Sequence, residues 1–263
     1  MKPVILALIL ASLAFAGCKR NAIYPDTAPP DAPTGLATAT GDNFIEISWD
    51  QNRESDIAGY NVFVSSSYTG RYELIGSTKR PYFMDKGAVN GNIYYYAVTA
   101  FDFEGNESPL SKDVAYDIPR PEGYNVMLSD YRLAPATGGY DFSNFAVVPY
   151  DDRYADVYFE NFNGRVYLDV QTDSDIEDMG PTGSVLEIST APSGGWSSTH
   201  DAEVQVGHTY IIWTWDDHYA KVRVSGLSPS RVTFDWIYQL RPSTPLLKHG
   251  RAERAPATAN RSR

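Results

Sequence analysis

Hydrophobic and polar residues alternate over much of the chain, and this period of two is typical of strands with one buried face. Three early segments show it most clearly, namely residues 44–49, 60–64 and 94–100. Turn-rich segments separate them, at residues 50–56, 65–70 and 86–92. Short strands at this spacing, with no helical stretch between them, predict an antiparallel sandwich.

The stretch from Pro30 to Asp117 carries several motifs. It opens with PDAPTGL, places Trp49 on the second strand, continues with GYNVFV, and ends with YFMDKGAVNGNIYYYAVTAFDFEGNESPLS. These residues resemble a fibronectin type III domain of the bacterial kind. The resemblance implies an immunoglobulin-like sandwich over residues 32–118, with Trp49 in its core and the hydroxyl of Tyr94 tied back to upstream backbone. It also implies a non-catalytic spacer or binding module.

Residues 121–240 form a second β-rich region, and the boundary before it is marked by Pro119-Arg120-Pro121. The alternation predicts seven strands there, at residues 145–148, 156–159, 166–170, 185–188, 209–215, 219–224 and 232–238. Such a series predicts a second antiparallel β-sandwich or barrel, so that the whole chain is all-β. The segments GHTYIIWTWDDHYAKVRV and VTFDWIY resemble the last strands of HmuY-like haem-binding envelope lipoproteins, and no ligand is carried over from that resemblance.

The N-terminus has the pattern of a targeting segment. The apolar run from Val4 to Ala16 is too short to cross a bilayer and is typical of a signal-peptide core, which we place at residues 1–17. The sequence Ala-Gly-Cys ending at Cys18 resembles a bacterial lipobox, with Phe15 where a leucine is commoner. The resemblance implies a diacylglycerol on the Cys18 sulfur and cleavage before that residue. The alternative is an ordinary cleaved signal peptide with an incidental cysteine.

A proline-containing linker is predicted at residues 18–31. Lys19 follows the cysteine, and by resemblance to enteric lipoproteins the absence of Asp there favours the outer membrane over the inner one. Membrane contact is thus expected through the N-terminal lipid.

The chain of 263 residues has a formal net charge of -11. An acidic protein repels the phosphate backbone of a nucleic acid, so we expect no nucleic-acid binding. The single cysteine excludes a disulfide framework and a cysteine zinc site. Residues 241–263 depart from this balance, with six basic residues and one acidic residue, and are predicted to be a disordered basic tail.

Motifs for catalysis are missing: there is no phosphate-binding loop, HExxH or GxSxG. We therefore expect no enzyme activity and no cofactor. His200, His208 and His218 are candidate ligands for a metal or a haem iron, since a hairpin would bring His208 near His218. Surface or loop histidines are the favoured alternative, because their spacing follows no known ligand pattern.

Two further segments are candidates for ligand binding. Trp213 and Trp215 are two residues apart, which would place both on one sheet face as a stacking platform for a sugar; the alternative is a sandwich core. The acidic segment 173–178 begins like a calcium-binding loop but lacks its glycine and final glutamate, so a solvated acidic loop is predicted.

These patterns predict a non-catalytic cell-envelope lipoprotein that contacts a protein or a glycan. One alternative is capture of a small ligand, haem or a sugar, by the second β region through His208, His218, Trp213 and Trp215. A second alternative is a hydrolase of envelope polymers.

Overall fold

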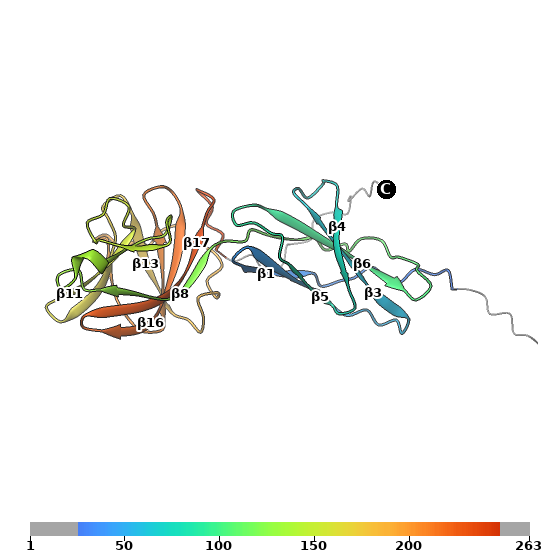
Figure 1. Cartoon of the computed structure of the whole chain (residues 1–263), viewed down its shortest axis with the longest axis horizontal. Coiled ribbons are helices and arrows are strands. Elements are labelled where there is room, and N and C mark those ends of the chain that lie inside the picture. The colour runs from blue at the N-terminus through green and yellow to red at the C-terminus, as the bar shows by residue number, and fades with distance from the viewer. Residues whose placement is uncertain (1–25, 248–263) are drawn as a thin grey trace, which may run out of the picture.

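The computed structural model describes residues 26–247, in which every element except one short 3-10 turn is a strand. The all-β prediction is confirmed. Two domains follow one another along the long axis of the molecule (Figure 1). We call β1 to β7 the front domain and β8 to β17 the distal domain. The signal peptide, Cys18 and the end of the basic tail lie outside the described residues.

The front domain is a sandwich of two antiparallel sheets. The three-stranded sheet has the order β1-β2-β5 and the four-stranded sheet the order β4-β3-β6-β7. The strands are β1 (Ala37–Gly41), β2 (Phe44–Ser48), β3 (Ile57–Ser65), β4 (Glu73–Thr78), β5 (Tyr82–Asp85), β6 (Tyr94–Asp102) and β7 (Ala115–Asp117). Apolar residues from both sheets share one core, as the alternating pattern predicted.

Two residues of the front domain confirm the roles expected of them. Trp49 is 6% exposed and meets the ring of Tyr60 edge-on, with centroids 5.2 Å apart. The hydroxyl of Tyr94 accepts a hydrogen bond of 2.9 Å from the backbone N–H of Val89, five residues upstream. This is the tyrosine corner, which fixes the chain where it enters β6.

The distal domain is a second sandwich, of two five-stranded antiparallel sheets, so the barrel alternative is excluded. One sheet has the order β10-β9-β11-β12-β14 and the other β13-β15-β16-β17-β8. The first contains β9 (Gly139–Asp141), β10 (Ala146–Val148), β11 (Val157–Phe162), β12 (Arg165–Asp169) and β14 (Asp201–Glu203). The second contains β8 (Glu122–Ser129), β13 (Asp175–Pro181), β15 (His208–Trp213), β16 (Tyr219–Ser228) and β17 (Arg231–Gln239). The 3-10 turn spans Pro135–Thr137, and a large apolar core lies between the sheets.

The junction between the domains is a packed segment, since residues 118–121 are all buried. The N–H of Arg120 reaches the carbonyl of Gly41 in the front domain, and the N–H of Tyr238 in the distal domain donates to the carbonyl of Pro121 at 3.1 Å. Burial lowers the pKa of Arg120 to about 10, although Asp117 opposes this. Both domains therefore contact this short connection.

The strand predicted at residues 185–188 is wrong. The Glu187 side chain accepts from the N–H of Gly183 at 2.8 Å, and the Ser184 hydroxyl accepts from the N–H of Leu186 at 3.1 Å. These side-chain bonds satisfy backbone donors locally and close a turn in place of a ladder.

The acidic segment is also a correction, because residues 175–178 belong to β13 and pair with β15 rather than forming a loop. Ile176 is fully buried between acidic neighbours that face outward. One inward side chain is enough to place this short strand on the sheet.

The first residues of the predicted basic tail pack against the distal domain. Leu247 is fully buried against Ala191 and Ile211, and its N–H donates to the carbonyl of Ser189 at 2.8 Å. The expectation that order ends at Arg241 is therefore wrong for residues 241–247, where adjacent leucines supply the apolar anchor. Within the described range, no helix is long and apolar enough to cross a membrane.

Candidate functional site

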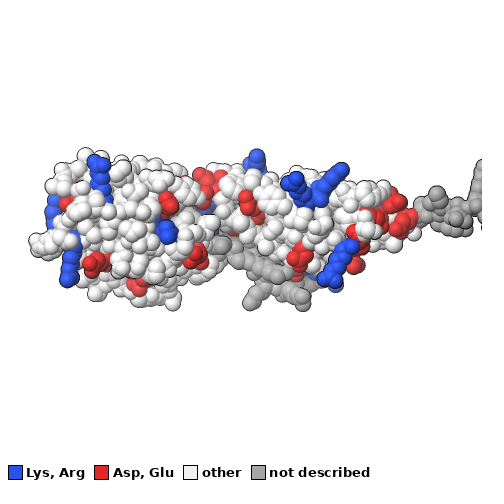
Figure 2. All heavy atoms as spheres, turned by 90° about the horizontal axis from the view of Figure 1, so that it is seen from below, with Lys and Arg blue, Asp and Glu red and all other residues white. Residues whose placement is uncertain are grey.

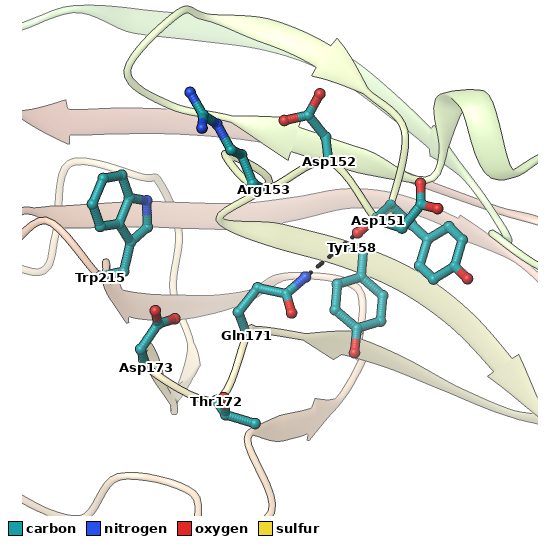
Figure 3. Close-up of a pocket in the computed structure, with 9 residues that line it drawn as sticks. Asp151, Asp152, Arg153, Tyr158, Gln171, Thr172, Asp173 and Trp215 are labelled. Carbon is teal, nitrogen blue, oxygen red and sulfur yellow. Dashed lines mark hydrogen bonds between the residues drawn. The ribbon is translucent and has the colours of Figure 1, made fainter.

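The candidate site is a groove of about 370 Å³ in the distal domain (Figure 3). Its lining residues are Tyr150, Asp151, Asp152, Arg153, Tyr158, Gln171, Thr172, Asp173 and Trp215. They come from β11 and three connections: the one between β10 and β11, the one between β12 and β13, and the β15–β16 turn. The volume falls within the range of about 300–1,000 Å³ found for small-ligand sites.

Short-range hydrogen bonds shape each connection. The Asp152 side chain accepts from the N–H of Tyr154 at 2.9 Å, which closes the first turn. In the second connection, the N–H of Ser174 donates to the carbonyl of Gln171 at 2.9 Å. The hydroxyl of Thr214 donates to Asp216 at 2.5 Å and holds the turn that carries Trp215. The groove walls are therefore built from compact turns.

The aromatic surface of the groove has two parts. Trp215 is 47% exposed, and the ring of Tyr154 lies 6.4 Å away at a tilt. Tyr150 and Tyr158 pack with Tyr131, which stacks on Tyr150 at 4.2 Å and meets Tyr158 edge-on at 5.7 Å. Trp215 thus offers an open ring face, whereas the tyrosines are held by one another.

No charged side chain that lines the groove forms an ion pair with another residue of the described range. Within residues 26–247, the exposed carboxylates of Asp151 and Asp173 have no hydrogen-bond or ion-pair partner. Arg153 is the one cation among the lining residues, and its guanidinium lies 4.3 Å from the centroid of the Tyr154 ring. Gln171 donates weakly to the carbonyl of Tyr150, at 3.5 Å.

Asp169 stands next to this lining on β12. It faces Tyr158 across the β11–β12 ladder and precedes Gln171 by two residues. It is 9% exposed, and its Oδ2 has no hydrogen-bond partner among the described residues. Burial raises the pKa of Asp169 to about 8, and the carboxylates of Glu160 and Asp201 add to the rise. The nearby cation Arg132 forms its ion pair with Glu160, at 2.7 Å, rather than with Asp169.

The raised pKa predicts that Asp169→Asn stabilises the protein at high pH. Between its ordinary value of 3.8 and about 8, the folded state holds a proton that the unfolded state releases, so this contribution to stability is lost as pH rises. We expect the variant to exceed the wild type by about 1–3 kcal/mol in free energy of unfolding at pH 8.5, because it removes the negative charge that the buried carboxylate would carry there. The difference should vanish near pH 4. Urea unfolding across this pH range measures it, and a gain that is constant with pH would contradict the assignment.

The structure separates the two tryptophans that the sequence placed together. β15 ends at Trp213, so Trp215 lies in the following turn and the expectation of a shared sheet face is wrong. Trp213 stacks on Tyr219 at 5.7 Å, and its Nε1–H donates to Asp217 at 2.9 Å. Trp215 lines the groove and Trp213 does not.

The histidines are also apart. His208 and His218 lie at opposite ends of the β15–β16 hairpin, so the expectation that the hairpin brings them together is wrong. His208 Nδ1 lies 2.9 Å from a carboxylate oxygen of Asp178, and His218 Nδ1 lies 2.8 Å from the carbonyl of Gln239. His200 Nδ1 lies 2.9 Å from the carbonyl of Ser174. In each of the three histidines, Nδ1 therefore has a hydrogen-bond partner close to its own position in the fold.

One acidic cluster lies outside the groove, in the front domain. Asp26, Asp56 and Asp102 bring carboxylate oxygens within 4.8 Å of one another. Both oxygens of Asp102, however, accept hydrogen bonds of 2.8 Å from Asn106. The cluster alone is not sufficient to identify a metal site.

Several groove residues were not singled out from the sequence. Tyr150, Gln171 and Thr172 lie on connections where no periodicity marks a residue as functional. Asp173 was noted as the first residue of the acidic segment, but that pattern suggested a calcium-binding loop rather than a groove.

No family model matches the chain. An amylopullulanase of Thermoanaerobacterium thermosulfurigenes is 39% identical over 93 residues, which is 35% of this chain and 5% of that protein. Exoglucanase B of Cellulomonas fimi is 28% identical over 115 residues, 42% of this chain and 10% of its own length. Chitinase Chi52 of Paenibacillus xylanexedens is 24% identical over 194 residues, 64% of this chain and 36% of its own length.

Among solved structures, an Fn3-like protein from Clostridium thermocellum is 30% identical, with a TM-score of 0.31, and the match covers 36% of this chain and 100% of that one. This chain spans only small parts of the amylopullulanase and the exoglucanase, and no catalytic domain is shown in it. With its motifs, its two-sheet sandwich and its tyrosine corner, the front domain is a fibronectin type III-like domain.

Proposed function

We propose that this chain is a non-catalytic glycan-binding protein of the cell envelope, and that the distal domain holds the glycan in the groove. The observation that carries the proposal is the half-exposed indole of Trp215 beside unpaired polar side chains. A sugar has an apolar ring face and polar edges, so it requires an aromatic plate together with hydrogen-bonding groups. The groove supplies both.

The relatives support the proposal through their names. Fibronectin type III-like segments similar to this front domain occur in proteins named amylopullulanase and exoglucanase, where they occupy 5–10% of the length. These names describe enzymes of glycan breakdown. A module of that kind serves here as a spacer between the membrane anchor and the distal domain.

Retention on polysaccharide tests the proposal. The full chain, purified in detergent, is mixed with insoluble glucan, chitin and peptidoglycan, and the bound fraction is measured. We expect retention on at least one polymer and release by the matching soluble oligosaccharide. Absence of retention on all three would contradict the proposal.

The envelope location rests on acylation of Cys18, which we propose on the lipobox resemblance. Cys18→Ala is expected to move the protein from the membrane fraction to the soluble fraction, because several acyl chains at about 0.8 kcal/mol per buried methylene supply the anchoring. Fractionation with radioactive palmitate labelling measures this, and density-gradient separation of the two membranes tests the outer-membrane assignment. A Cys18→Ala protein that remains membrane-bound would refute the anchor.

A further inference from the structure

We propose that the glycan bound in this groove carries free amino groups, as a glucosamine polymer does. This inference rests on the proposed function, and it concerns which class of sugar the same site prefers. It follows from the kind of polar group that surrounds Trp215.

The hydrogen-bonding groups of the groove are dominated by acceptors. Asp151, Asp152 and Asp173 line it, and the carboxylates of Asp151 and Asp173 have no partner within residues 26–247. Figure 3 shows Asp173 projecting from its turn on the Trp215 side, and Asp151 beyond Tyr158. An ionised carboxylate accepts hydrogen bonds and donates none. Carboxylates on two sides of the groove therefore favour a ligand rich in donors.

Positive charge in the groove does little to offset these carboxylates. Arg153 is the only basic residue in the lining, and its guanidinium donates to the Tyr154 hydroxyl and covers the Tyr154 ring. It forms no ion pair with the three lining carboxylates. An anionic glycan would meet net repulsion, whereas an ammonium group would form charge-assisted hydrogen bonds.

Asp169 lies beside the groove on β12, although it is not one of the lining residues. Its side chain is about nine-tenths buried, its Oδ2 has no donor, and it sits on the strand face that carries Tyr158. Buried acceptors without donors are uncommon and call for a partner. An ammonium group offers three donors, more than any neutral sugar substituent.

The test compares oligomers that differ at one substituent. The full chain in detergent is titrated calorimetrically with tetramers of glucosamine, N-acetylglucosamine and glucose at pH 6 and low salt. We expect the glucosamine tetramer to bind about tenfold more tightly than the acetylated one, which corresponds to about 1.4 kcal/mol and is within reach of two exposed ion pairs. Salt should reduce the preference, since the groove is open to solvent.

Variants separate this inference from the proposed function. Asp151→Asn with Asp173→Asn should remove the preference for the amine, so that the glucosamine and N-acetylglucosamine tetramers bind with equal affinity. Trp215→Ala should weaken binding of all three tetramers. Acidic side chains also lie on the front domain (Figure 2). Glu73 and Glu104 are exposed there and do not line the groove, so Glu73→Gln with Glu104→Gln serves as the control for charge attraction outside it.

Four outcomes would overturn the inference. Equal affinity for the amine and acetyl tetramers, with Trp215→Ala weakening both, would leave the glycan site standing and refute its preference. An amine preference that persists in the Asp151→Asn, Asp173→Asn variant, or that disappears in the Glu73→Gln, Glu104→Gln control, would place the attraction elsewhere. Failure of every tetramer to bind would remove the proposed function itself.

Discussion

Trp215→Ala is expected to weaken glycan binding about 30-fold, which corresponds to about 2 kcal/mol for a binding hot spot. The reason is geometric: the indole is 47% exposed at the groove and is the open ring face there. Truncation to alanine removes the stacking surface, while the turn that carries it is held by Thr214 and Asp216. Calorimetric titration with the retained oligosaccharide measures the loss.

A matched variant keeps this prediction specific. Phe103 in the front domain is 72% exposed and lies outside the groove. Phe103→Ala should bind the glycan as the wild type does and should unfold at the same temperature as Trp215→Ala. If the two alanine variants bind equally well, Trp215 is not part of the site.

Phe159→Ala is expected to destabilise the distal domain by about 3–5 kcal/mol, the usual cost of truncating a buried phenylalanine. Phe159 is fully buried in the distal core, and its neighbour Tyr158 lines the groove. Loss of this ring should lower the temperature of the distal unfolding transition and weaken glycan binding as the domain loosens. The front domain should be spared, because its core is a separate cluster.

Differential scanning calorimetry of the full chain checks this with Trp49→Ala as the mirror variant. Trp49 belongs to the front core, so that variant should shift the other transition and leave glycan affinity unchanged. If both variants shifted both transitions equally, the domains would unfold as one unit and the division into two cores would have no energetic meaning.

The front domain was predictable because its information is local. Ile45, Ile47 and Trp49 point inward at every second position, and Tyr94 lies at a fixed distance along the chain from the backbone group that it binds. The distal domain was harder, because its signals compete. In β13 one inward Ile176 stands among acids, so polarity hides the strand. At residues 185–188 the apolar residues suggest a strand, but Ser184 and Glu187 bind the backbone and make a turn.

The groove was predictable only at Trp215. Its other walls are turns brought together from residues 150–153 and 171–173, and their approach depends on how the strands between them pair. The predictions that Trp213 shares a face with Trp215 and that His208 lies near His218 were wrong for the same reason. Where β15 ends, and which residues face each other along the hairpin, are set by register, and no single segment of sequence contains that information.

Hydrogen–deuterium exchange of the full chain, with and without the retained oligosaccharide, tests the central claim most directly. We expect slower exchange in the three groove connections, at residues 150–153, 171–173 and 214–217, and unchanged exchange in the front domain. Protection confined to the front domain, or none in those three connections while the glycan is bound, would contradict it.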